Sequence, residues 1–414
     1  MSKPVVSEYE DPNHPANKMA TALGRPPLNL RDTKTAFKYK NDGSLRHTAR
    51  MFNLMNKRWL VDLGSKVGLK AVQWGLPLAE TITRATIFRQ FVGGRTLQES
   101  SELIEHLYDH GVITILDYGS EGNTSEAGLD QTLAEFMRSL EYAATQPSAE
   151  VIAIKITGLA RFELLERVQK AGRVADELHE EYERVRDRLE KLCRTAQQFG
   201  VRIFIDAEES WIQDTIDTLT VDLMERYNRE TVLIYNTYQM YRHDRLAVLK
   251  KHHERARLKG YLLGVKLVRG AYMDKERARA TEMGYDDPIQ VDKKATDRDF
   301  NAALRYCIEH YLTIGLCNGS HNEESTYLMA RLIDERNISR NHPHLMFCQL
   351  YGMSDNLTFN LAAAGYVAAK YVPYGSVKEV VPYLVRRAQE NSSVTGEMGR
   401  ELTLVRKELT RRGM

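Results

Sequence analysis

The chain has 414 residues, of which 58 are Lys or Arg and 56 are Asp or Glu, so the formal net charge is +2. This length suffices for a barrel-sized domain plus a helical segment, and a charge so near zero gives no reason to expect nucleic acid as a partner. The four cysteines are scattered without a Cys-x-x-Cys motif, which argues against a disulfide framework and fits a reducing compartment.

The N-terminal stretch carries acidic residues and has no apolar core, so it is neither a secretory signal nor a clear transit peptide. The longest apolar region, Val67–Val92, is interrupted by Lys70, Glu80, Arg84 and Arg89, so we do not expect it to span a bilayer. A buried pair of amphipathic helices is favoured, and a helix lying on a membrane surface is the alternative. We therefore expect a cytoplasmic protein, with peripheral contact to the inner face of a membrane as a further option.

Alternating strand and helix patterns begin near residue 100. Thr96 and Glu99 form a capping box that predicts a helix closing at Gly111. The clearest later helix has apolar residues spaced by three and four from Leu178 to Leu192, and it ends at Gly200. Eight apolar, β-branched runs separate such helices: Val112–Leu116, Val151–Ile156, Val201–Ile205, Val232–Tyr235, Tyr261–Val268, Thr313–Leu316, His344–Leu350 and Tyr366–Val372.

Near-continuous apolar strands that alternate with helices predict a parallel sheet covered by helices, of the α/β class. Eight such units match a (β/α)8 TIM barrel, and an open doubly wound sheet is the alternative. The chain has no Gly-x-Gly-x-x-Gly after its first strand, no Walker loop, no Gly-x-Ser-x-Gly elbow and no His-Glu-x-x-His, so none of the chemistries that these motifs carry is indicated.

Polar residues stand where the predicted strands end, which is where barrel enzymes collect their catalytic groups. A structural ion pair would explain any one of them, Lys155 included, because a buried charge is costly unless it is paired. Many such strand ends together predict a pocket that binds an anionic group and relies on a cofactor, since no metal-ligand set or hydroxyl triad is evident. The segments are Asp117–Glu121, Lys155, Asp206–Glu209, Asn236–Gln239, Lys266–Tyr272, Asn318–Asn322, Gln349–Met353 and Lys370–Tyr374.

A second cationic feature follows the last predicted strand. Read as a helix, Tyr383, Arg386, Arg387 and Glu390 fall on one face. Adjacent guanidinium groups beside an aromatic ring and an acid predict a clamp for a carboxylate. The alternative is a solvated basic face.

The segments Ile205–Glu209, Lys266–Tyr272 and Tyr383–Asn391 resemble the signature segments of the proline dehydrogenase family, in its monofunctional type. The resemblance runs from about residue 100 to residue 395. It implies a distorted flavin-binding (β/α)8 barrel whose final helix lies over the barrel mouth, preceded by an N-terminal helical segment (1–100) and followed by a basic tail (396–414). Ser376 and Glu379 predict a capping box for that final helix, and Pro382 predicts a kink in it.

The resemblance implies FAD as cofactor and L-proline as substrate, oxidised to 1-pyrroline-5-carboxylate in the first step of proline catabolism. Hydride would pass from proline C5 to flavin N5, and electrons would then pass to a membrane quinone. A separate pyrroline-5-carboxylate dehydrogenase would consume the product. The basic residues Arg406, Lys407, Arg411 and Arg412 fit membrane contact, or equally a solvated tail.

The resemblance also assigns roles to residues. Asp206 and Lys266 are the implied catalytic residues, Lys266 standing where many bacterial members have arginine. Solvent or Asp206 would take the amine proton. The implied substrate-binding residues are Lys155, Tyr272, Leu350, Tyr371, Tyr383, Arg386, Arg387 and Glu390, with Glu121 as a gate. The implied cofactor-binding residues are Ala207, Gln239, Lys266, Arg269, Gly270, Ala271, Ser320 and His321, with Asn322 nearby.

Three alternatives are weighed against this interpretation. Hydroxyproline oxidation on the same scaffold is disfavoured by Tyr371, because that relative has a smaller residue there. Methylenetetrahydrofolate reductase, a second flavin barrel, would not need the double-arginine helix. An inactive barrel that only binds an amino acid or a membrane partner is disfavoured by the intact Lys155, Asp206 and Arg386.

Overall fold

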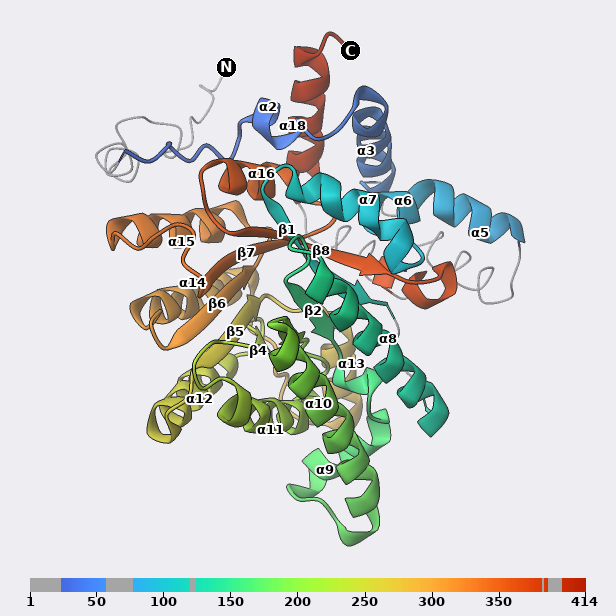
Figure 1. Ribbon diagram of the computed structural model, residues 1–414, viewed down its shortest axis with the longest axis vertical. Coiled ribbons are helices and arrows are strands. Elements are labelled where there is room, and N and C mark those ends of the chain that lie inside the picture. The colour runs from blue at the N-terminus through green and yellow to red at the C-terminus, as the bar shows by residue number, and fades with distance from the viewer. Residues whose placement is uncertain (1–23, 57–76, 120–123, 382, 386–396) are drawn as a thin grey trace.

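Eight parallel strands close into a barrel in the computed structural model of the protein (Figure 1). The structure describes residues 24–56, 77–119, 124–381, 383–385 and 397–414. Each strand pairs with the next along the chain, and β1 also pairs with β8, from Val112 opposite Ala368 to Tyr118 opposite Tyr374. The strands are β1 (Val112–Tyr118), β2 (Val151–Ile154), β3 (Arg202–Ile205), β4 (Ile234–Gln239), β5 (Leu263–Val268), β6 (Ile314–Gly319), β7 (Leu345–Leu350) and β8 (Ala368–Tyr374).

The predicted (β/α)8 barrel is therefore confirmed, and the open sheet is wrong. Each of the eight apolar runs overlaps a strand. The runs predicted for β1, β4, β6 and β8 end before their strands do, because these strands continue into polar residues such as Asn236 and Asn318. Lys155 lies just beyond β2 rather than inside it. The barrel closure buries such polar residues: Asn236 and Asn318 are both fully buried.

Helices surround the barrel, as Figure 1 shows. They include α2 (Thr33–Ala36), α3 (Asp42–Met55), α5 (Pro77–Thr83), η1 (Arg84–Phe88), α6 (Arg89–Phe91), α7 (Leu97–Tyr108), α8 (Glu126–Thr145), η2 (Ile156–Gly158), α9 (Phe162–Ala171), η3 (Asp176–Leu178), α10 (His179–Phe199), α11 (Ser210–Tyr227), α12 (Arg245–Lys259), α13 (Met273–Met283), α14 (Lys293–Glu309), α15 (Glu323–Glu335), α16 (Asp355–Ala363) and α18 (Glu397–Arg411). Residues 377–381 and 383–385 are helical as well.

The residues from which the helix ends were predicted stand at helix ends in the structure. The Thr96 side chain accepts a hydrogen bond from the Glu99 amide at 3.2 Å, which opens α7. Gly200 ends α10 with φ of 69°, a left-handed conformation that glycine adopts without strain. The Ser376 amide donates to Glu379 at 2.7 Å, and the Glu379 amide donates to Ser376 at 3.4 Å, so the second capping box is also confirmed.

Strand residues alternate between two cores. Phe204, Tyr235 and Met346 point into the barrel and pack together there. Their strand neighbours, such as Ile203 and Ile205 on either side of Phe204, pack outward against the helices. This alternation leaves the ends of the strands free to carry polar side chains into the barrel mouth.

A separate apolar cluster joins the segments before and after the barrel. Phe37, Leu45 and Phe52 pack there with Leu402 and Val405 of α18. The stretch predicted as a basic tail is thus largely a helix, which stands beside α2 and α3 in Figure 1. Of the predicted Val67–Val92 helix pair, only the part from residue 77 onward lies within the described residues. Among the helices described, none is at once long enough and apolar enough to cross a bilayer.

A buried ionic cluster fixes this layer to the barrel. Asp355, at the start of α16, pairs through one carboxylate oxygen with Lys370 of β8 at 2.9 Å. Its other oxygen pairs with Lys40 at 2.9 Å and accepts a hydrogen bond from the Tyr39 hydroxyl at 2.8 Å. Burial opposes ionisation of Asp355, but the two ammonium groups outweigh it and hold the pKa of Asp355 well below its ordinary value.

Candidate functional site

A cavity of about 260 Å³ opens at the carboxyl ends of the barrel strands. Fourteen residues predicted for the site line it: Lys155, Asp206, Ala207, Gln239, Lys266, Arg269, Gly270, Ala271, Tyr272, Ser320, His321, Leu350, Tyr371 and Tyr383. The predicted residues Glu121, Arg386, Arg387 and Glu390, and the predicted kink at Pro382, lie outside the described residues. The structure thus brings the described members of the predicted set together, and their individual roles stay predictions.

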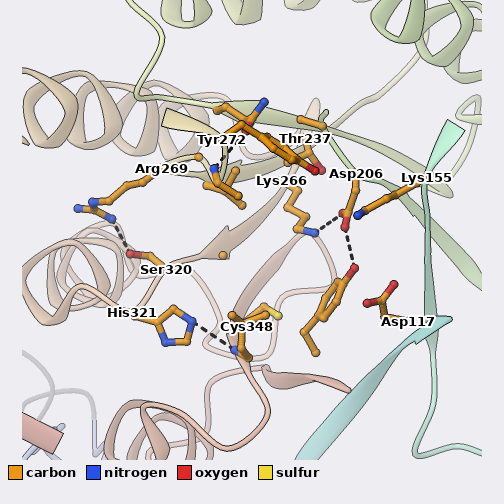
Figure 2. A pocket seen from close by; sticks show the side chains of 18 of the residues that line it. Asp117, Lys155, Asp206, Thr237, Lys266, Arg269, Tyr272, Ser320, His321 and Cys348 are labelled. Atoms are coloured by element: carbon orange, nitrogen blue, oxygen red, sulfur yellow. Dashed lines mark hydrogen bonds and ion pairs between the residues drawn. The ribbon is translucent and has the colours of Figure 1, made fainter. Parts of the chain in front are cut away.

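An ion pair stands at the centre of the cavity, as Figure 2 shows. Lys266 Nζ, from β5, donates to Asp206 Oδ1 at 2.5 Å, and the side chains of Lys266 and Asp206 are 7% and 16% exposed. The other oxygen of Asp206 accepts a hydrogen bond from the Tyr371 hydroxyl at 2.6 Å. Burial disfavours the charge on Lys266, but its attraction to Asp206 prevails, so the pKa of Lys266 is raised.

Asp117 was predicted only as the first residue of the strand-end segment Asp117–Glu121, without a role of its own. It lies near the end of β1, is 9% exposed and lines the same cavity. Burial, followed by the charges of Asp117 and Asp206, holds the pKa of the Tyr371 hydroxyl well above its ordinary value. Tyr371 therefore stays a neutral donor between two carboxylates.

Lys155 faces the cavity at the end of β2, beside the buried Glu208. Glu208 accepts hydrogen bonds from the amide of Thr157 at 3.1 Å and from its hydroxyl. Burial raises the pKa of Glu208 to about 7, although the positive charge of Lys155 opposes that rise. The backbone oxygen of Glu208 also accepts from the Gln239 amide at 2.7 Å, which fixes the Gln239 side chain at the cavity wall.

The turn after β5 brings a cation and bare backbone to the cavity. Arg269 donates to Ser320 at 2.6 Å and to Asp297 at 2.9 Å, and its guanidinium lies over the Phe300 ring at 4.4 Å. Gly270 has φ of 134°, and a Cβ there would lie 2.4 Å from the Tyr241 ring. Only glycine therefore allows this turn to pack closely against Tyr241.

His321 lies opposite this turn, in the loop that follows β6. Its Nδ1 lies 2.9 Å from the Ser354 hydroxyl, and its Nε2 accepts a long hydrogen bond of 3.5 Å from the Leu350 amide. Asn322 caps α15 by accepting from the Ser325 amide at 2.9 Å. Both residues line the cavity.

The remaining lining residues were not assigned a role from the sequence. Cys348 lies in β7, within a run already predicted as a strand, and only its register would have placed it in the cavity. Thr237 lies in β4, within the polar segment Asn236–Gln239 that was predicted at a strand end. The strand-end position was the available signal for Asp117, which stands one residue from the end of β1. These residues are Asp117, Thr237, Val268, Gly319 and Cys348.

The donor set fits a large, partly anionic, partly aromatic ligand. Cations at Lys155 and Arg269 suit carboxylate or phosphate groups, and the fixed amide of Gln239 suits a ring that carries carbonyl and N–H groups. Val268 and Leu350 supply apolar wall. Within the described residues no group of three or more His, Cys, Asp or Glu side chains is arranged to hold a metal ion.

Comparison with known proteins identifies the family of the chain. The family model described as proline dehydrogenase matches residues 100–400. Mitochondrial proline dehydrogenase 1 of Dictyostelium discoideum is 31% identical over 427 residues, covering 92% of this chain and 74% of that protein. Hydroxyproline dehydrogenase of Xenopus laevis is 32% identical over 383 residues, covering 84% of this chain and 80% of that protein.

A solved structure supports the fold. The chain is similar to proline utilization A of Bdellovibrio bacteriovorus, whose crystal structure was determined after inactivation by N-propargylglycine. The match has a TM-score of 0.70 at 18% identity and covers 92% of this chain. It covers only 41% of that longer protein.

Proposed function

Because the chain belongs to the proline dehydrogenase family, we propose that it oxidises L-proline to 1-pyrroline-5-carboxylate with FAD as cofactor. The observation that carries this proposal is the cationic cavity at the barrel mouth, with the Lys266–Asp206 pair at its centre and Tyr371 beside it. The domain division at residues 100 and 395 is part of the same proposal.

The residues that hold the cofactor are assigned from the donor set. Arg269, with Ser320, suits the phosphates, and the amide of Gln239 together with Lys266 suits the polar edge of the ring system. When bound, the flavin would accept at N5 the hydride that leaves proline C5, and this hydride carries both electrons of the oxidation.

The remaining residues orient the substrate. Lys155, with Arg386 and Arg387, binds the proline carboxylate, because fixed cations define where the reacting carbon lies. Tyr371 and Leu350 wall the proline ring and exclude water. Tyr272 and Tyr383 complete the wall, and Glu390 and Glu121 steady the arginines.

The ring nitrogen must lose its proton so that its lone pair can assist hydride departure. Both oxygens of Asp206 already accept hydrogen bonds, from Lys266 and Tyr371. We therefore assign Asp206 the task of fixing these two donors, and we assign the amine proton to solvent.

Electrons then leave the site for a membrane quinone in this proposal. The exposed outer face of α18, with Arg406, Lys407 and Arg411, supports contact with an anionic membrane surface on the cytoplasmic side. A separate dehydrogenase acting on 1-pyrroline-5-carboxylate would consume the product.

Hydroxyproline is the second candidate substrate, since hydroxyproline dehydrogenase is among the relatives. Tyr371 favours proline, because its ring is 5% exposed and its hydroxyl is held against Asp206, which leaves it no freedom to make room for a hydroxyl on the substrate ring.

The test is anaerobic addition of L-proline to the purified protein while the visible absorbance of flavin is followed, with trans-4-hydroxy-L-proline in parallel. Bleaching by proline and weak bleaching by hydroxyproline are expected. Lys155→Met and Arg386→Ala should weaken proline binding, and Lys191→Met, on the exposed face of α10, should not. A protein without flavin, or with flavin that neither amino acid reduces, would refute the proposal.

A further inference from the structure

A chain of hydrogen bonds connects the C-terminal helix α18 to the cavity. Glu401 of α18 accepts from the Ser354 amide through Oε2 at 2.8 Å and from the Ser354 hydroxyl through Oε1 at 3.0 Å. The Ser354 oxygen in turn lies 2.9 Å from Nδ1 of His321, which lines the cavity. Nothing in the family resemblance assigns a role to Glu401 or Ser354.

The donors and acceptors in this series of hydrogen bonds determine where the hydrogen of the His321 ring lies. A hydroxyl has one hydrogen to donate, and an ionised carboxylate can only accept, so the Ser354 hydroxyl donates its hydrogen bond to Glu401. The Ser354 oxygen then has only lone pairs to offer His321, and Nδ1 must carry the hydrogen. A neutral imidazole with hydrogen on Nδ1 has a lone pair on Nε2.

A longer contact on the other side of the ring favours the same arrangement while Glu401 is ionised. The Leu350 amide points at Nε2 from 3.5 Å and can only donate. Two contacts on opposite edges of the His321 ring therefore select one tautomer.

The backbone at Ser354 indicates that this arrangement is built in. Ser354 has φ of 50°, and within the described residues it shares a positive φ with Asn337 alone among non-glycine residues. Such a conformation costs about 1 kcal/mol or more and persists only where neighbouring contacts hold it. The paired hydrogen bonds from Ser354 to Glu401 are those contacts.

Glu401 lies among several charged groups. Asp355 of α16, Lys370 of β8, and Lys40 and Tyr39 beyond α2 form the ionic cluster beside it, and Arg400, its neighbour on α18, donates to the His321 backbone oxygen at 3.3 Å. Burial raises the pKa of Glu401 to about 7, and the charge of Asp355 acts in the same direction while Lys370 opposes it. Glu401 therefore changes charge near neutral pH.

We propose that Glu401 is a positioning residue that acts through Ser354 to set the tautomer of His321 at the cofactor site. With Glu401 ionised, His321 carries its hydrogen on Nδ1 and presents a lone pair at Nε2. With Glu401 protonated, the acid donates to the Ser354 oxygen, and the Ser354 hydroxyl donates to Nδ1. The hydrogen of His321 then moves to Nε2, and the long contact of 3.5 Å with the Leu350 amide is lost. We call the hydrogen-bonded series Glu401–Ser354–His321 the relay. Its effect on cofactor binding rests on the proposed function, whereas the relay itself does not.

The relay is tested by ¹⁵N NMR of the full-length protein labelled at histidine, with the His321 signals identified by their loss in His321→Asn. At pH 8 the wild type should show a pyrrole-type Nδ1 and a pyridine-type Nε2. Glu401→Gln should exchange these two signatures, because the glutamine amide donates to the Ser354 oxygen. Ser354→Gly tolerates the positive φ and removes the hydroxymethyl side chain that contacts Nδ1, so it should abolish the preference for hydrogen on Nδ1.

Two controls make the outcome decisive. Glu408→Gln neutralises a buried carboxylate on the same helix that pairs with Arg411 and Arg412, and it should leave the His321 signals unchanged. A pH titration of the wild type needs no variant at position 401 and should show the pyridine-type signal moving to Nδ1 as the pH falls through about 7.

A pyridine-type Nδ1 in the wild type at pH 8, or signals unchanged in both Glu401→Gln and Ser354→Gly, would overturn the proposal. Absence of proline oxidation would count against the proposed function alone.

Discussion

Lys266 and Asp206 face each other across the barrel mouth, with Lys266 Nζ 2.5 Å from Asp206 Oδ1. They come from β5 and from the end of β3, so the barrel itself sets their separation. Tyr371 of β8 binds the same carboxylate from a third direction. Asp206 is therefore the point at which three strands of the site are fixed relative to one another.

Removing one partner of this pair should cost more than removing both. Asp206→Asn leaves the Lys266 ammonium buried without a counter-charge, so we expect a loss of about 3 kcal/mol in the free energy of unfolding. Adding Lys266→Met should recover part of that loss, since the uncompensated charge is gone. Urea unfolding of the two single variants and the double variant checks this, with Asp222→Asn on α11 as an exposed control. A double variant less stable than Asp206→Asn would contradict the argument.

Tyr371 should control the choice between proline and hydroxyproline. Tyr371→Ser opens space beside the substrate ring, and we expect kcat/KM for trans-4-hydroxy-L-proline relative to that for proline to rise on the order of tenfold. Tyr371→Phe keeps the ring and removes only the hydrogen bond to Asp206. It should lower activity without changing this ratio. Steady-state kinetics with both substrates distinguishes the cases, and an unchanged ratio in Tyr371→Ser would be the contrary result.

Arg269 should be needed as an arginine. Its fork contacts Asp297 and Ser320 while its plane lies over Phe300, and lysine cannot reproduce this combination. Arg269→Lys should therefore purify with less flavin per chain, as measured by the ratio of visible to ultraviolet absorbance. Arg298→Lys, at an exposed position on α14, serves as the matched control. Equal flavin content in the two variants would contradict the assignment of Arg269 to cofactor binding.

Asp355 should account for part of the acid sensitivity of the fold. Because its pKa is lower in the folded protein than in the unfolded chain, its contribution to stability is present above the ordinary pKa of about 4 and is lost as the pH falls below that value. Wild type should thus lose more stability than Asp355→Asn between pH 5 and pH 2, although the variant is less stable at neutral pH. Urea unfolding across that range checks the difference in slope, and parallel curves would contradict it.

The contribution of Glu401 to stability should change with pH in the direction opposite to that of Asp355. Its pKa of about 7, against an ordinary value of 4.5, means that the folded protein binds a proton more tightly than the unfolded chain between these values. Stability from this group is therefore lost as the pH rises from 4.5 to 7, by about 3 kcal/mol in total. Relative to wild type, Glu401→Gln should gain about that amount between pH 4.5 and pH 8 in urea unfolding. A stability difference that does not depend on pH would rule out this titration.

The fold was predictable because its signals are local. Apolar runs marked the strands, and residues such as Thr96 and Gly200 marked the helix ends where the structure has them. Much of the site was predictable for the same reason, since polar strand ends such as Lys155 and Asp206 meet at one edge of a parallel barrel.

The parts of the site and fold that were not predicted depend on contacts between segments that are distant in the sequence. Cys348 enters the cavity by strand register, which a single sequence does not reveal. The helix α18 resembled a charged tail because its apolar residues Leu402 and Val405 become meaningful only against Phe37 and Phe52. Glu401 and Ser354 are 47 residues apart and share no local pattern.

The pairing of β1 with β8 has a consequence for how the protein is made. Loop closure between segments so far apart in the chain is slow compared with the formation of neighbouring contacts. During synthesis, the edge of β1 that faces β8 has no partner until β8 has been translated, and only then does Tyr371 reach Asp206. The cavity is thus among the last parts of the barrel to form, and uptake of a ligand there would report that the whole ring of strands is complete.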